Sequence, residues 1–101
     1  MLSIEDQFHQ GMVAVYETAA ERGYRATYFK RMLEEHGGVE AAKRLLEGET
    51  IQSGLMKLWE LDLLGHSMEA LVLQERFRLL FTSEELRKAQ RRLDELGYFR
   101  A

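Results

Sequence analysis

The chain has 101 residues, a net charge of −3 and no cysteine, and 46% of its residues are hydrophobic. This length suits one domain, and the composition is apolar enough to bury a core. The absence of cysteine excludes disulfides, thiol catalysis and cysteine-ligated zinc. No secretory signal is expected, because Glu5 and Asp6 stand where a basic and then apolar leader would lie. Apolar runs are short, so we expect a cytoplasmic protein with no membrane partner.

The first expected helix covers residues 4–22, with apolar side chains at helical spacing at Phe8, Met12, Val15, Tyr16 and Ala19. Ser3 suits the N-cap, and Asp6 follows it at the spacing of a capping box. Gly23 and Tyr24 fit the left-handed and apolar positions that close a helix.

Two shorter helices are expected over residues 26–36 and 39–47, separated by Gly37 and Gly38 and ended by Gly48. Their brief connection predicts a tight hairpin that resembles a helix-turn-helix. After a loop over residues 49–52, Ser53 is expected to cap a helix over residues 54–61.

A turn with Gly65 as breaker and Ser67 as cap precedes a helix over residues 68–75. This helix is apolar around most of its circumference, which is typical of a central helix. Residues 76–81 are expected to form a helical turn that plugs the core with Phe77, Leu80 and Phe81. Thr82 and Glu85 then have capping-box spacing for a helix over residues 83–96, closed by Gly97 and Tyr98. The fold class is therefore all-α, a single compact domain of five to six short helices.

The stretch from His36 to Gly38 invites two functional interpretations. A phosphate-binding loop is rejected, because no strand precedes the glycines and no Lys-Ser/Thr pair follows. A DNA-reading helix pair is disfavoured, because the outward positions of the second helix are half acidic: Glu40, Lys43, Arg44 and Glu47. We interpret this stretch as a helix stop and restart, with opposite charges paired along the surface.

The last helix is the better candidate for nucleic-acid binding. Residues 76–101 carry 7 Lys/Arg and 4 Asp/Glu, a net +3, whereas residues 1–75 carry a net −6. The candidate contacts, placed on the polar face of this helix, are Arg87, Lys88, Arg91 and Arg92. The preferred alternative is that this strip balances the acidic residues across the fold or across a dimer.

Catalytic chemistry is not expected. The four serines lie at or next to expected helix caps, so none suits a nucleophile. A histidine–carboxylate site is a third hypothesis, at Glu35 and His36 or at His66 and Glu69. No metal or cofactor is predicted, because the supporting ligand set is missing.

Several short motifs together resemble a widespread group of small bacterial proteins and appended domains of uncharacterised function. They are Gly23-Tyr24 with Thr27 and Phe29, His36-Gly37-Gly38, Leu58-Trp59-Glu60, Glu69-Ala70 and Leu80-Phe81-Thr82. The resemblance covers residues 8–98, but residues 61–67 depart from the Arg-Leu-Asp-Leu-Thr-like stretch of that group. It implies, by analogy, an accessory or adaptor module.

The leading functional hypothesis is therefore a non-catalytic protein-interaction module, with a homodimer as one possibility. Candidate interface residues are Trp59, Tyr28, Leu63, Leu64, Tyr98 and Phe99. For Trp59, a role as a core anchor is preferred, because Leu55 and Leu58 share its side of the helix.

Overall fold

The computed structural model describes residues 2–48 and 53–99, and in these residues it contains helices and no strand. The elements are α1 (Ile4–Glu21), α2 (Thr27–His36), α3 (Gly38–Leu45), α4 (Ser53–Glu60), the 3₁₀ segment η1 (Leu64–His66), α5 (Met68–Val72), the 3₁₀ segment η2 (Glu75–Leu80) and α6 (Ser83–Glu95). The predicted all-α fold class is confirmed.

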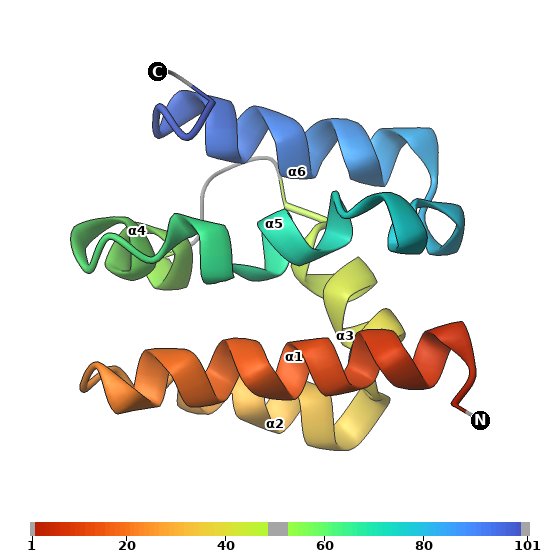
Figure 1. The fold of residues 1–101 in the computed structure, drawn as a ribbon, viewed down its shortest axis with the longest axis horizontal. Helices are drawn as coiled ribbons and strands as arrows, with labels where there is room; N and C mark the ends of the chain where they lie inside the picture. Colours follow the sequence, from red (N-terminus) through yellow and green to blue (C-terminus); the bar gives the residue numbers. More distant parts are fainter. Residues whose placement is uncertain (1, 49–52, 100–101) are drawn as a thin grey trace.

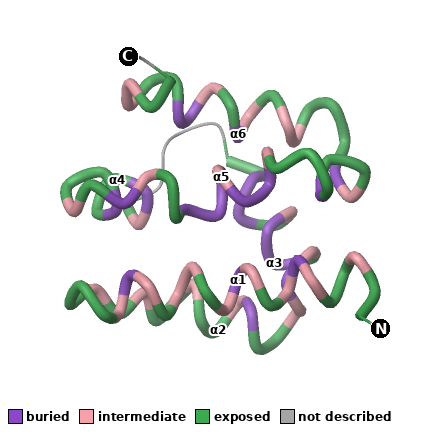
Figure 2. Tube along the Cα trace, in the orientation of Figure 1, coloured by how far each residue is buried: buried purple, intermediate pink, exposed green. Residues whose placement is uncertain are grey.

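The helices are arranged in three layers (Figure 1). α1 and α2 pack side by side along one face, and α6 lies along the opposite face. Between them run α4, η1, α5 and η2, and α3 leads from the first layer into the middle one. The overall extents are 35 × 30 × 24 Å. As predicted, α5 is central, and most of its residues are buried (Figure 2).

Three phenylalanines form the centre of the main core. The ring of Phe8 from α1 lies 5.2 Å from the ring of Phe77 and 5.2 Å from that of Phe81, in edge-to-face arrangements. Such pairs add about 0.5–1.5 kcal/mol to the area that they bury. The predicted plug over residues 76–81 is therefore confirmed. It forms as a separate 3₁₀ segment, because Gln74 adopts an extended backbone and α5 ends at Val72.

The predicted N-caps are present at three helices. Ser3 Oγ accepts from the Asp6 backbone N–H at 3.0 Å, and Ser67 Oγ accepts from that of Ala70 at 3.1 Å. Thr82 and Glu85 form the reciprocal capping box of α6. At α4, by contrast, Ser53 is the first helical residue, and the predicted loop over residues 49–52 lies outside the described residues.

Two helix ends close as predicted, and a third closes in the same way without a glycine. The backbone N–H of Tyr24 donates to Ala19 at 2.9 Å, and that of Tyr98 donates to Leu93 at 3.0 Å. At the end of α4, Leu63 N–H donates to the Leu58 carbonyl at 2.8 Å. Asp62 takes the left-handed position there, with φ of 60°. Aspartate tolerates this conformation better than most residues do.

The joint between α2 and α3 is a single residue, Gly37, whose φ of +79° only glycine adopts readily. Gly38 then begins α3 against α1, and its backbone N–H donates to Nδ1 of His9 at 3.0 Å. A Cβ at position 38 would lie 2.6 Å from Cα of His9. The predicted tight hairpin is thus confirmed, and its second glycine permits close helix packing.

Candidate functional site

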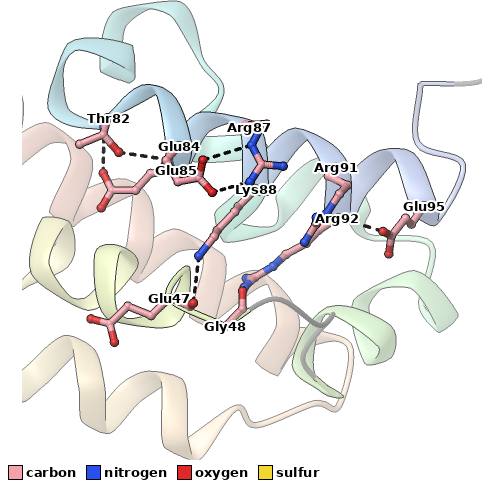
Figure 3. A network of polar contacts seen from close by, with 10 residues as sticks. All are labelled: Glu47, Gly48, Thr82, Glu84, Glu85, Arg87, Lys88, Arg91, Arg92 and Glu95. Carbon is pink, nitrogen blue, oxygen red and sulfur yellow. Dashed lines mark hydrogen bonds and ion pairs between the residues drawn. The ribbon is translucent and has the colours of Figure 1, made fainter.

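The basic side chains of α6 are held by partners within the protein (Figure 3). Arg87 bonds to Glu84 one turn earlier, and Arg91 lies 3.7 Å from the carboxylate of Glu95. Lys88 Nζ donates to the backbone carbonyl of Glu47 at 2.9 Å. Exposed pairs of this kind contribute about 0–1 kcal/mol each, but they occupy the charges that a nucleic acid would use.

Arg92 does not belong to that surface, and the prediction that it lies on the polar face of α6 is wrong. Its exposed fraction is 1%. The reason lies in helical spacing, because Arg92 follows Ala89 by three residues and precedes Leu96 by four, which puts it on the buried side of α6. Only three members of the predicted basic cluster remain accessible.

The side chain of Arg92 instead joins α6 to the end of α3 and to α5. Its Nη1 donates to the Leu45 carbonyl at 3.1 Å and to Oε2 of Glu69 at 3.3 Å, and its Nη2 donates to the Gly48 carbonyl at 2.6 Å. Leu45 and Gly48 lie at the C-terminal end of α3, where the helix dipole favours a cation. We call Arg92, Glu69 and these two carbonyls the buried junction.

Glu69 is the buried acid of this junction, and its exposed fraction is 4%. Burial is the largest influence on its ionisation, and it raises the pKa of Glu69 above the ordinary value. The backbone N–H of Glu69 and the Arg92 guanidinium lower the pKa without cancelling that effect. The predicted pairing of Glu69 with His66 is not found, because His66 is exposed while Glu69 faces Arg92.

The pKa of a second acid, Glu85 on α6, is shifted in the opposite direction. Partial burial acts to raise the pKa of Glu85, but hydrogen bonds from Lys43 and from the Thr82 backbone outweigh it and hold that pKa below the ordinary value. Lys43 Nζ lies 2.8 Å from Oε1 of Glu85, so this lysine, expected in a surface ion pair along its own stretch, forms one that joins α3 to α6.

The other histidine–carboxylate candidate lies on the surface. His36 Nε2 is 3.8 Å from Glu35 Oε2, and the Glu35 side chain is more than half exposed. Within residues 2–48 and 53–99, no three His, Asp or Glu side chains group in a way that would hold a metal ion.

Four of the six predicted interface residues gather where α4 and the C-terminal end of α6 meet, at one end of the molecule (Figure 1). Trp59 and Leu64 flank a hollow of about 330 Å³ together with Tyr98. The Phe99 ring packs edge-to-face on that of Tyr98, with centroids 5.2 Å apart. We call these four residues the end patch.

The exposure of the aromatic rings makes this patch unusual. Trp59 is 48% exposed, and Tyr98 and Phe99 are similarly accessible. The preferred interpretation of Trp59 as a core anchor is therefore wrong. Scattered exposed apolar residues need no explanation, but a group of large aromatic side chains is typical of binding surfaces.

Two predicted interface residues lie elsewhere. Leu63 is buried with Leu58 and Ala19 in a small second core, so the prediction that it is an interface residue is wrong. The closure of α4 at Asp62 turns Leu63 inward, because the residue after a left-handed closing position packs back on its helix. Tyr28 is 60% exposed at the start of α2, where it lines a different cavity.

One acid, Asp62, lies at the border of the end patch. Asp62 lines the hollow beside Trp59, and Asp94 is exposed one turn before Gly97. Among the described residues neither carboxylate has an ion-pair partner, whereas the neighbouring Glu60 and Glu95 are paired with Lys57 and Arg91. The hollow thus combines aromatic surface with one acid, Asp62, and the Arg22 guanidinium donates to the carbonyl of the preceding Leu61.

No family model, curated protein or solved structure matches this chain. The resemblance to small bacterial domains drawn from its motifs therefore stays a prediction. Among its described helices, none has both the length and the apolar character needed to cross a bilayer.

Proposed function

We propose that this protein is a non-catalytic interaction module that binds a partner protein through the end patch. The single observation that carries the proposal is the exposure of three aromatic rings, of which Trp59 and Tyr98 line a small hollow and Phe99 packs on Tyr98. Tryptophan and tyrosine are the residues most enriched among those that dominate binding energy. An apolar residue of the partner would pack against the exposed faces of these rings.

The acid beside Trp59 bears on the charge of that partner. Asp62, which lines the hollow, favours a segment that carries lysine or arginine beside its apolar anchor. A second copy of this chain fits less well, because a two-fold contact through this patch brings two copies of Asp62 into one interface without adding a cation of its own to the hollow. The partner is therefore inferred to be a different protein with a basic, apolar-centred segment.

Nucleic acid is the weaker alternative. Arg92 is buried, and Arg87, Lys88 and Arg91 each have an acceptor within the protein. Releasing these contacts would offset part of the electrostatic gain from binding phosphates.

A selection from a random-peptide display library on the immobilised protein tests the proposal. Selected peptides should combine a large apolar residue with flanking Lys or Arg, and Trp59→Ala or Tyr98→Ala should weaken them by roughly tenfold or more. Leu79→Ala is the matched control, since Leu79 is 99% exposed but lies in η2 at the other end of the molecule (Figure 1).

Three results would contradict the proposal. One is a set of peptides that bind Trp59→Ala as well as they bind the unmodified protein. Another is selection of acidic rather than basic flanks. The third is a dimer in light scattering that Trp59→Ala dissociates, because the end patch would then serve self-association.

A further inference from the structure

A second, larger cavity lies apart from the end patch. It has a volume of about 520 Å³ and is lined by α1, the connection to α2 and the start of α2, the end of α3, α4 and the start of α5. It shares no lining residue with the hollow at the end patch. Pockets for small molecules commonly fall in this size range and sit between helices.

Aromatic rings form much of the wall of this cavity. Tyr16, Tyr24, Tyr28 and Phe29 all line it. One of these rings already faces a cation, because Lys30 Nζ lies 5.4 Å from the centroid of the Tyr16 ring. The negative face of a tyrosine ring attracts a positive charge at such distances.

The cavity also contains a buried acid, Glu69. Its bond to Arg92 is a single contact of 3.3 Å, longer than is usual for a charged pair. Arg92 divides its donors between that carboxylate and the carbonyls of Leu45 and Gly48, so its positive charge also compensates the negative end of α3. A carboxylate has room for about four hydrogen bonds, which leaves Glu69 able to accept from the cavity side.

The geometry points to a binding site for a small organic cation with an apolar body. Its ammonium group donates to the carboxylate of Glu69, and its body lies against the tyrosine rings. An anion is disfavoured, because the buried carboxylate repels it across a medium that screens poorly. The exposed Arg25 also lines the cavity and would repel a cation. The preference for a cation must therefore come from the interior wall, where Glu69 lies.

Three probes of equal size and different charge test this inference: benzylammonium, benzyl alcohol and benzoate. Binding is followed by the amide NMR shifts of Thr27 and Gly54, two residues that line the cavity. Benzylammonium should bind about tenfold more tightly than benzyl alcohol, and benzoate more weakly than either, because hydrogen bonds to a charged group are the stronger ones. Equal affinities, or shifts confined to other regions, would overturn the inference.

Two tyrosines provide a matched pair of variants that leave the interior intact. Tyr28→Ala removes an exposed wall residue and should weaken benzylammonium by at least about twofold, the lower range of a cation–π contact. Tyr98→Ala, in the end patch, should leave benzylammonium binding unchanged. If both variants behave alike, the cavity is not the site.

Glu69→Gln tests the charge itself. It should abolish the preference for benzylammonium over benzyl alcohol, and a preference that persists in the folded variant would overturn the role of Glu69. Should that variant fail to fold, the Tyr28→Ala and Tyr98→Ala comparison still decides the location of the site. The inference is independent of the proposed function, because peptide binding at the end patch responds to Tyr98 and cation binding to Tyr28.

Discussion

Beneath α6 two charged side chains lie inside the protein, whereas at the end patch three aromatic rings lie partly in solvent. Arg92 and Glu69 are almost fully buried, whereas Trp59, Tyr98 and Phe99 are about half exposed. In the buried junction, the guanidinium of Arg92 donates to Glu69 and to the carbonyls of Leu45 and Gly48, all inside the protein. At the end patch, apolar surface remains in contact with water, and this is where a partner gains most from binding. The comparison separates residues that stabilise the fold from residues available for recognition.

The largest expected effect is on stability at the buried junction. Arg92→Met leaves Glu69 buried without its partner, and removing one member of such a pair typically costs about 3–5 kcal/mol. Arg91→Met, on the neighbouring and more exposed position, should change the free energy of unfolding by less than about 1 kcal/mol. Urea denaturation measures both. Equal losses in the two variants would contradict the account of the junction.

A double variant refines this prediction. Glu69→Leu combined with Arg92→Met removes both charges and should recover most of the stability lost in Arg92→Met alone. A double variant as unstable as the single one would show that the bonds to the carbonyls of Leu45 and Gly48 matter more than the ion pair.

Alanine substitutions at two glycines compare the packed interior with the border of the end patch. Gly38→Ala places a methyl group against the backbone of α1 and should destabilise the protein by about 1–3 kcal/mol. Gly65→Ala should be tolerated, because its Cβ would lie 3.5 Å from the Tyr98 hydroxyl, an ordinary contact. Thermal unfolding of the two variants checks the contrast, and equal melting temperatures would contradict it.

The two acids with shifted pKa values should respond to pH with opposite signs. The raised pKa of Glu69 means that its contribution to stability is present below its unfolded-state pKa, near 4.5, and is lost as pH rises through its folded-state value. The lowered pKa of Glu85 means that its contribution is present above about pH 4.5 and is lost as pH falls.

Unfolding free energies between pH 3 and pH 7 test these signs against Glu69→Gln and Glu85→Gln. The advantage of the unmodified protein over Glu69→Gln should shrink as pH rises, and its advantage over Glu85→Gln should grow. The same sign for both differences would contradict the contrast between the interior and the surface acid.

The smallest expected effect concerns Asp62, which joins the fold to the end patch. Asp62→Gly relieves its left-handed backbone and should stabilise the protein by up to about 1 kcal/mol, whereas Asp62→Ala should destabilise it. Both changes remove a charge beside Trp59, so both should weaken a basic peptide. In Asp62→Gly, stability should then rise while peptide binding weakens. A change of both in the same direction would contradict the separation between residues that stabilise the fold and residues that bind a partner.

The helices and most of their caps were predictable because they depend on local chemistry. Apolar spacing predicted α1 to α6, and Ser3, Ser67 and Thr82 cap helices where the sequence indicated. Asp62 was missed, because glycine is the expected residue at a left-handed helix end. That omission misplaced Leu63, whose direction depends on the closure of α4.

The sequence contained an indication of the buried junction, although charged residues are usually expected at the surface. Glu69 is the only charged residue in an otherwise apolar stretch over residues 68–73, and Arg92 has the helical spacing of the buried face of α6. A lone acid and a lone base on apolar faces indicate a buried pair. The end patch, in contrast, depends on how α4 and the end of α6 meet, and no local pattern contains that information.

The fluorescence of Trp59 tests the central claim most directly, because it is the only tryptophan in the chain. Titration with a selected basic peptide should shift its emission to shorter wavelength and reduce its quenching by acrylamide, with saturation at the same concentration in Leu79→Ala. Saturable peptide binding that leaves both the emission and the quenching of Trp59 unchanged would contradict a partner site at the end patch.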